Sequence, residues 1–313
     1  MAQSAPLLLR VVASSVNASA RAGKIIRDIM SQGDLSIVEK GKNDLQTEAD
    51  RSAQRCILAS LSRQFPNVTI IGEEDSSNCE VPSDWVVAES DPDVLGIKLP
   101  PHLENLEDKD LCIWVDPLDG TSEYTQGLVE HVTVLIGVAV REKAIGGVIH
   151  QPYYKNPDNG ELGRTMWGID GVGTGGLKLI APPEGKRVIT TTRSHFDSTV
   201  KSAMDAMGAD EVLRVGGAGH KVLLLLEGKA HAYVFASAGC KRWDTCGPEA
   251  ILHAFGGTLT DVHGERYSYN AETGHPNKGG VLATAPGQPH SWYLAQSIKF
   301  KKLHRIYCIQ NFK

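Results

Sequence analysis

The sequence predicts an α/β fold with two lobes, built from layers of helices and sheets. With 313 residues, the chain is long for a single core and suits two packed lobes. The first half opens with two long stretches of helical periodicity, followed by clustered apolar runs, which indicates an α+β lobe. The second half alternates strand-like and helical segments, which is typical of a layered α/β lobe. We place the lobes at residues 1–155 and 156–313, with the boundary in the loop 151–163.

The first half supplies two predicted helices and at least four predicted strands. The helices are expected over 5–31 and 45–64, and the strands near 68–75, 111–115, 131–140 and 144–149. Residues 76–110 differ, with nine acids, four prolines and little periodicity. Insertions of this length are usually lids or disordered segments. We expect a short helix inside this acidic insertion and leave its role open.

The second half supplies the alternating pattern. Strands are expected near 187–195, 211–217, 230–236 and 257–262, and helices near 197–207, 218–227 and 245–255. The stretch "GVGTGG" at 171–176 fits the spacing of a dinucleotide-binding loop, but no helix follows it. A glycine-rich hairpin is therefore expected there.

Composition narrows the class of protein. A net charge of −5 argues against a nucleic-acid-binding surface, and no apolar stretch reaches the length of a membrane span. The six cysteines form no CxxC pair and indicate reduced thiols. A plain first helix is favoured over a signal or transit peptide. We expect a cytoplasmic protein that acts on a small molecule, without a nucleic acid, a membrane or an obligate protein partner.

Acidic residues recur where predicted strands end or predicted helices begin. They are Asp50, Glu73, Glu74, Asp116, Asp119 and Asp244. Mg²⁺ prefers oxygen ligands in near-octahedral geometry, and the absence of histidine and cysteine from this set argues against zinc. The backbone carbonyl of Leu118 could add another oxygen. Each acid has an alternative explanation, because Asp-Pro and Asp-Gly form turns and Asp244 could simply cap a helix.

The stretch "WVDPLDGTSEY" at 114–124 combines two kinds of site. Pro117 stiffens the turn and Gly120 allows it to bend, so Asp116 and Asp119 can converge. A short helix is predicted from Thr121, and its free N–H groups could bind an anion. The pattern indicates a metal-phosphate site.

The order Asp50, "GEED", "DPLDGT", "WDTCGPE" resembles the metal-dependent, lithium-sensitive phosphomonoesterase superfamily of inositol monophosphatases and fructose bisphosphatases. Within it, stretches such as "NDLQTEADRSAQ", "ITTTRSH" and "LRVGGAGHK" resemble the 3'(2'),5'-bisphosphate nucleotidases. The resemblance implies a layered α-β-α-β-α sandwich. It also implies hydrolysis of the 3'-phosphate of adenosine 3',5'-bisphosphate, and of 3'-phosphoadenylyl sulfate and inositol 1,4-bisphosphate, in nucleotide metabolism and sulfur assimilation.

The resemblance also assigns roles to individual residues. Glu73, Asp116, Asp119, Asp244 and the Leu118 carbonyl would bind two or three Mg²⁺ ions. Asp50 and Thr121 would orient and deprotonate the attacking water. The substrate would contact Gly120, Thr121, Thr192, His195, Gly217 and Lys221.

Two other functions stay open from the sequence. An inositol monophosphatase-like enzyme would need no contacts to a 5'-phosphate and usually has a shorter insertion before Asp116. A non-catalytic metal- or nucleotide-binding protein is disfavoured by the intact set of carboxylates and Thr121. The tail at 300–313 departs from the resemblance and has no assigned meaning.

Overall fold

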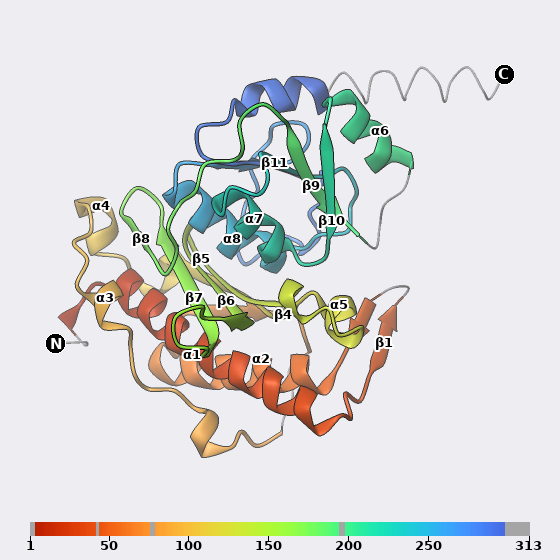
Figure 1. The fold of residues 1–313 in the computed structure, drawn as a ribbon. Helices are drawn as coiled ribbons and strands as arrows, with labels where there is room; N and C mark the ends of the chain where they lie inside the picture. Colours follow the sequence, from red (N-terminus) through yellow and green to blue (C-terminus); the bar gives the residue numbers. More distant parts are fainter. Residues whose placement is uncertain (1–3, 42–43, 76–78, 194–197, 298–313) are drawn as a thin grey trace.

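The computed structural model describes residues 4–41, 44–75, 79–193 and 198–297. Within these residues, helices and sheets alternate in five layers, as the α-β-α-β-α prediction requires (Figure 1). From bottom to top, Figure 1 shows α1 and α2, a first sheet, α7 and α8, and a second sheet, with α6 at the upper right and the blue helix 290–297 at the top. The predicted fold class is confirmed.

The helices begin and end close to their predicted positions. Their bounds are α1 Leu7–Gln32, α2 Glu48–Gln64, α3 Pro92–Leu95, α4 Pro101–Glu104, α5 Thr121–Thr125, α6 Ser198–Ala206, α7 Ala218–Leu226 and α8 Arg242–Ala254. The acidic insertion contains two short helices, α3 and α4, where one was predicted. None of the helices described is both long and apolar enough to cross a membrane.

The first sheet carries the longest strands of the described residues in the order β3-β4-β5-β6-β7-β8. Their bounds are β3 Thr69–Gly72, β4 Leu111–Asp119, β5 Thr133–Val140, β6 Lys143–Lys155, β7 Leu162–Ile169 and β8 Gly173–Gly175. The β3–β4 pair is parallel, and the other pairs of this sheet are antiparallel. Every residue of β4 and β5 is buried, because helices cover both faces of this sheet. The β7–β8 pair is the hairpin predicted for "GVGTGG".

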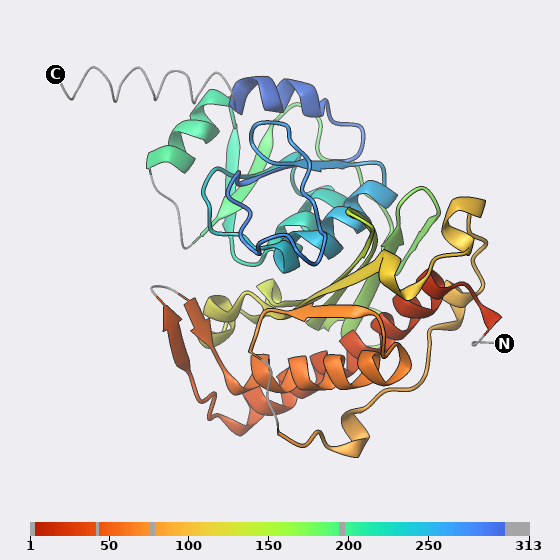
Figure 2. The same ribbon diagram turned by 180° about the vertical axis from the view of Figure 1, so that it is seen from behind.

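The second sheet has the order β10-β9-β11-β13-β12 and mixes parallel and antiparallel pairs. Its strands are β9 Val188–Thr192, β10 Glu211–Val215, β11 Ala232–Phe235, β12 Thr258–Thr260 and β13 Val281–Thr284. A separate hairpin, β1 Val38–Gly41 with β2 Asp44–Gln46, lies beside the first sheet (Figure 2). The helix predicted to begin at residue 45 therefore begins three residues later, at Glu48.

The predicted lobe boundary at residues 155 and 156 falls inside the β6–β7 hairpin. Both of these strands belong to the first sheet, which continues to Gly175. The polar loop between them resembles a linker in sequence, but it closes a hairpin in which Gln151 pairs with Arg164. The division of the chain into two lobes remains a prediction.

Helix α8 lies directly against the backbone of the first sheet. A Cβ added at Gly147 on β6 would lie 2.2 Å from the carbonyl oxygen of Gly247 on α8. A Cβ added at Gly137 on β5 would lie 2.5 Å from the side chain of Cys246. These glycines therefore allow a close helix–sheet approach that any side chain would prevent.

We expect Gly147→Ala to lower the free energy of unfolding by roughly 1–3 kcal/mol, the usual cost of overpacking a core. The measurement is urea unfolding followed by circular dichroism. Gly274→Ala is the control, because a Cβ there meets nothing within 4 Å. Equal urea midpoints for the two variants would show that α8 can move away from the sheet at little cost.

Candidate active site

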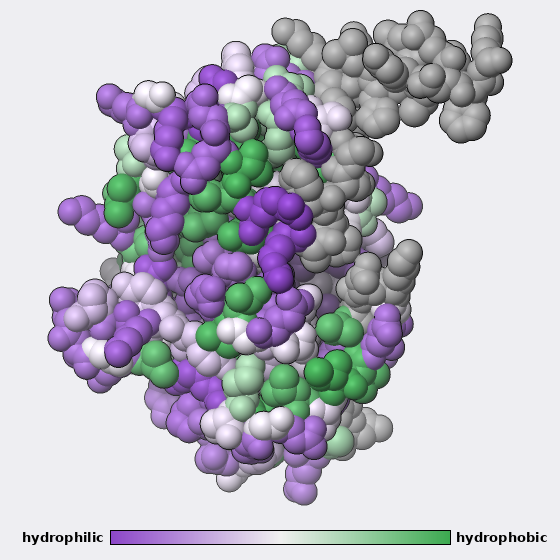
Figure 3. Space-filling model, turned by 45° about the vertical axis from the view of Figure 1, so that its right-hand side comes forward, coloured by the Kyte–Doolittle hydropathy of each residue, from purple (hydrophilic) through white to green (hydrophobic). Residues whose placement is uncertain are grey.

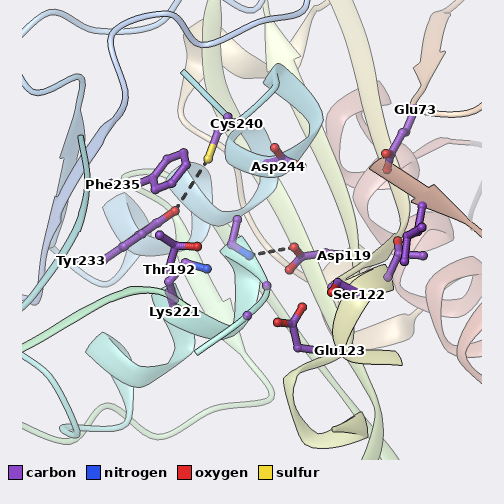
Figure 4. A pocket seen from close by; sticks show the side chains of 17 residues that line it. Glu73, Asp119, Ser122, Glu123, Thr192, Lys221, Tyr233, Phe235, Cys240 and Asp244 are labelled. Atoms are coloured by element: carbon purple, nitrogen blue, oxygen red, sulfur yellow. Dashed lines mark hydrogen bonds between the residues drawn. The ribbon is translucent and has the colours of Figure 1, made fainter. Parts of the chain in front are cut away.

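The candidate active site is a cavity of about 200 Å³ between the first sheet, α7 and α8 (Figure 4). The β4–α5 turn forms one wall, and β9, β11 and the starts of α7 and α8 form the other. The predicted site residues that line it are Glu73, Asp119, Gly120, Thr121, Thr192, Gly217, Lys221 and Asp244. The sequence-based prediction therefore names residues that the fold brings together from both halves of the chain.

The β4–α5 turn places two carboxylates side by side. The pairing of β4 with β5 is irregular between Asp116 and Asp119, so both side chains can face the site. Asp116 Oδ1 accepts a hydrogen bond from the backbone N–H of Leu118 at 3.1 Å. Gly120 then adopts φ +92°, a left-handed conformation that favours glycine, and α5 begins at Thr121.

Asp119 connects the first sheet to α7. Its carboxylate accepts hydrogen bonds from the hydroxyl of Thr133 at 2.6 Å and from the backbone N–H groups of Ala218 and Gly219 at 2.7 and 2.8 Å. It therefore provides hydrogen-bond acceptors for backbone N–H groups at the start of α7, which have no partner within the helix. This second role of Asp119 was not predicted, because Ala218 is 99 residues away in sequence.

Asp244 approaches the same point from α8. It lies in the first turn of α8 and accepts a hydrogen bond from the backbone N–H of Lys241 at 2.6 Å. Burial, followed by the charge of Glu73, raises the pKa of Asp116 well above its usual range. Burial and the charge of Asp119 also raise the pKa of Asp244. Carboxylates that share a buried site in this way favour binding of a hard cation, so the donor set fits Mg²⁺.

Glu73 follows β3 and is held by the β1–β2 hairpin. Lys40 Nζ lies 3.3 Å from Glu73 Oε1 and 2.9 Å from Glu74 Oε1, and Gln46 donates to Glu74. In Figure 4, Glu73, Asp119 and Asp244 approach the cavity from different sides. Accordingly, no three His, Cys, Asp or Glu side chains of the described ranges stand close enough together to enclose a metal ion. The carboxylates form an open group, with Glu73 paired to Lys40.

The hairpin that carries Lys40 has few apolar contacts of its own. All four residues of β1 are exposed, and Ile37 and Val38 are 53% and 48% exposed. The face shown in Figure 3 is mostly hydrophilic, with hydrophobic side chains gathered in patches. The ion pairs of Lys40, the hydrogen bond from Gln46 to Glu74 and the hydrogen bond from Arg51 to Gln46 therefore help to hold the hairpin against the site.

Asp50 and Thr121, which are predicted to act together in proton transfer, are hydrogen-bonded to each other. The Thr121 hydroxyl donates to Asp50 Oδ1 at 2.9 Å. Asp50 Oδ2 accepts from the backbone N–H and the hydroxyl of Thr47 at 2.8 and 2.5 Å, in a capping box that begins α2. Burial raises the pKa of Asp50 to about 6, although the hydrogen bonds from Thr47 lower it.

The opposite wall carries the residues predicted to contact the nucleotide. Thr192 ends β9, and Gly217 precedes α7 with φ +71°. Lys221 is buried, with its Nζ 5.2 Å from the centre of the Tyr233 ring. Burial lowers the pKa of Lys221, and the charge of Asp119 is the strongest opposing influence. His195 lies outside the described residues.

The sequence model of the Inositol monophosphatase family matches residues 8–300. The chain belongs to this family. It is 52% identical over 288 residues to the protein "3'(2'),5'-bisphosphate nucleotidase 1" of Homo sapiens, covering 91% of this chain and 93% of that protein. It is 38% identical over 310 residues to the protein of the same name from Dictyostelium discoideum, covering 94% and 98%. The family is metal-dependent, typically on Mg²⁺.

Solved structures of the inositol monophosphatase family share the fold. The extragenic suppressor protein suhB from Bartonella henselae has a TM-score of 0.67 at 21% identity, covering 91% of this chain and 96% of that one. CysQ from Bacteroides thetaiotaomicron, a bacterial member of the family, has a TM-score of 0.63 at 21% identity, covering 88% and 96%. At this identity the likeness concerns the layered architecture alone.

Sequence reasoning missed the ion pair between Glu123 and Arg193. Glu123 lines the cavity from α5 and lies 3.4 Å from Arg193, which follows β9 in the second sheet. Arg193 also donates to Gln126 at 2.8 Å. The pair therefore joins the two halves of this family member across the mouth of the site. The only sequence signal was an acid two residues after Thr121, which periodicity alone does not distinguish from a solvated helix residue.

We expect the difference in stability between Asp50→Asn and the wild type to depend on pH. From pH 4 to pH 7, the free energy of unfolding of the variant should rise by roughly 2–3 kcal/mol relative to that of the wild type, because a pKa unit corresponds to about 1.4 kcal/mol. The folded-state pKa of Asp50 is about 6, above the ordinary value of 3.8, so the folded protein binds this proton more tightly. The resulting stabilisation is complete below about pH 4 and is lost as the pH rises through 6. The measurement is urea unfolding in chelator across this pH range.

Glu48→Gln is the matched control, because Glu48 lies in the same first turn of α2. Burial raises the pKa of Glu48, but hydrogen bonds from Ser52, Arg55 and Arg51 outweigh it and lower the pKa below 4.5. The stabilisation from Glu48 is therefore lost as the pH falls, which is the opposite direction. The same pH dependence for both variants would contradict the assigned environment of Asp50.

Proposed function

We propose that this chain is a Mg²⁺-dependent phosphomonoesterase that hydrolyses the 3'-phosphate of adenosine 3',5'-bisphosphate to AMP and phosphate. The observation that carries the proposal is the identity of 52% to the human 3'(2'),5'-bisphosphate nucleotidase 1 over almost the full length of both chains. The hydrogen-bonded pair of Asp50 and Thr121 supports catalysis over a non-catalytic binding role. 3'-Phosphoadenylyl sulfate and inositol 1,4-bisphosphate are further candidate substrates.

The proposed metal ligands are Glu73, Asp116, Asp119, Asp244 and the Leu118 carbonyl. When bound, Mg²⁺ polarises the phosphate and lowers the pKa of a coordinated water. The carboxylates, with Asp50, carry more negative charge than two such ions neutralise once a phosphate dianion enters. Two or three ions are therefore expected. Of the two carboxylate oxygens of Glu73, Lys40 contacts Oε1, so the other oxygen could bind the metal.

Asp50 and Thr121 act on the attacking water in this proposal. The Thr121 hydroxyl donates to Asp50, so its oxygen lone pairs can accept a proton from water while its own proton passes to Asp50. Thr47 holds the carboxylate in place through two hydrogen bonds. The catalytic contribution of the chain is then positioning and electrostatic stabilisation, as in other phosphoryl transfers.

The nucleotide end of the substrate would lie against the second sheet and α7. Thr192, Gly217 and Lys221 line this side of the cavity, and His195 completes the proposed set. Lys221 can bind a phosphate as a point charge. The charge of Asp119 partly offsets the effect of burial on the pKa of Lys221, so Lys221 could also support this proposed metal ligand. A contact of Lys221 with the 5'-phosphate and a contact with Asp119 predict different dependences on the substrate.

The proposed function is tested by phosphate release from adenosine 3',5'-bisphosphate, inositol 1-phosphate and fructose 1,6-bisphosphate. We expect the highest kcat/KM for the adenosine compound in Mg²⁺, with no activity in chelator and inhibition by lithium or excess Ca²⁺. Ca²⁺ prefers longer bonds and looser geometry than Mg²⁺. Preference for inositol 1-phosphate would favour the alternative of an inositol monophosphatase-like enzyme.

Asp50→Asn is the catalytic control for this assay. It retains a side-chain oxygen near Thr121 but lacks a base, so we expect kcat to fall by ~10²–10⁴-fold. Activity that persists in this variant or in chelator would exclude the proposed mechanism.

Contact of Lys221 with the 5'-phosphate predicts a substrate-dependent defect. Lys221→Met fills the buried space without the charge. We expect kcat/KM for adenosine 3',5'-bisphosphate to fall by roughly 10–150-fold, equivalent to about 1.5–3 kcal/mol for a charged hydrogen bond. Hydrolysis of adenosine 3'-monophosphate should change little, because it has no 5'-phosphate. The control is Lys229→Met, which removes an exposed charge beside Glu227, just beyond α7. If kcat/KM falls equally for both substrates, Lys221 instead stabilises the Asp119 carboxylate and does not contact the 5'-phosphate.

A further inference from the structure

The side chain and backbone of Tyr269 connect the two elements that carry Asp116 and Asp244. Tyr269 lies in the loop between β12 and β13 and is fully buried. It packs in a cluster of buried residues that includes Trp114 on β4 and Trp243 on α8. It therefore lies where β4 and α8 meet, behind the carboxylates.

The backbone of Tyr269 contacts β4. Its carbonyl oxygen accepts a hydrogen bond from Trp114 Nε1 at 3.0 Å. Trp114 is two residues before Asp116, so the two side chains project from the same face of the strand. The Trp114 ring also lies 6.5 Å from the ring of Trp243, which directly precedes Asp244.

The hydroxyl of Tyr269 contacts α8. It donates to Glu249 Oε2 at 2.5 Å and lies 3.1 Å from Thr245 Oγ1. Thr245 directly follows Asp244 in the first turn of α8. Glu249 is buried too, so its carboxylate depends on this donor.

Asn277 extends the contacts to the residues that hold Asp244. Its Nδ2 donates to Thr245 Oγ1 and to the carbonyl oxygen of Lys241, both at 2.8 Å. The backbone N–H of Lys241 in turn donates to Asp244. A continuous set of buried and partly buried hydrogen bonds thus runs from Tyr269 to the start of α8.

We propose that Tyr269 is a positioning residue that sets the separation of Asp116 and Asp244 for metal binding. The inference rests on the proposed function, because it takes both carboxylates as Mg²⁺ ligands. Groups that hold metal ligands in place typically change metal affinity or activity by 10–100-fold when they are removed. Tyr269→Phe keeps the ring and the backbone bond to Trp114 but releases Thr245 and Glu249.

The test is Tyr269→Phe, with Mg²⁺ binding measured by isothermal titration calorimetry in the absence of substrate. We expect the Kd for Mg²⁺ to rise about 10-fold, the lower end of that range. Tyr267→Phe is the matched control, because the Tyr267 hydroxyl donates to the carbonyl oxygen of Gly280 rather than to Thr245 or Glu249. Both variants lose a tyrosine hydroxyl from the same loop, and urea unfolding in chelator should show the larger loss of stability in Tyr269→Phe, which leaves the buried Glu249 carboxylate without this donor.

The outcomes separate the inference from the proposed function. A higher Kd in Tyr269→Phe alone supports the positioning role. If the wild type binds Mg²⁺ and both variants bind it equally well, Tyr269 is only a core residue and the inference fails by itself. If the wild type does not bind Mg²⁺, the proposed metal site fails and the inference fails with it.

Thr245→Val independently tests the hydrogen bonds that connect Tyr269 to the start of α8. It removes Oγ1 with little change in shape, so the Mg²⁺ Kd should again rise by about 10-fold. Because the effect of Tyr269 passes through Thr245, the double variant should bind Mg²⁺ no more weakly than the weaker single variant. Fully additive losses would overturn this route.

Discussion

The accumulation of negative charge at the junction of β4 and α8 is the constraint on which the rest of the structure depends. Asp116 and Asp119 are buried, and Asp244 faces them from the neighbouring helix. Like charges in such a place are unfavourable without donors and cations. The surrounding structure supplies the donors, since Thr133 and the start of α7 hold Asp119. The backbone N–H of Lys241 does the same for Asp244.

The same charge explains why the site is assembled from several layers. In the proposed metal site, β3, β4 and α8 each contribute carboxylates from a different direction. These elements are held in place by hydrogen bonds between residues far apart in sequence, such as Trp114 with Tyr269 and Asp119 with Ala218. The glycines at 137 and 147 serve this arrangement, since they let α8 lie close enough to the sheet for Asp244 to reach the site.

The sequence predicted the elements and the residues near β4 because local patterns encode them. Apolar runs identified β4 and β5, and the spacing of Asp116, Asp119 and Gly120 indicated the turn. The pairs of Glu123 with Arg193 and of Lys40 with Glu73 could not be predicted in this way, because their partners lie 70 and 33 residues apart. The lobe boundary was placed within a hairpin because a polar loop has the same composition whether it links two lobes or two strands.

The position of α8 between the two sheets limits how this protein can change in evolution. One face of α8 lies on β5 and β6, and Ile251 and Leu252 belong to an apolar cluster that also includes Val188 and Val281 of the second sheet. A substitution on α8 must therefore fit the packing of two apolar clusters at once. A substitution in a loop at the mouth of the cavity affects the packing of one wall of the cavity only. New substrate preferences are accordingly more accessible through those loops, while the helix that carries Asp244 tolerates little variation.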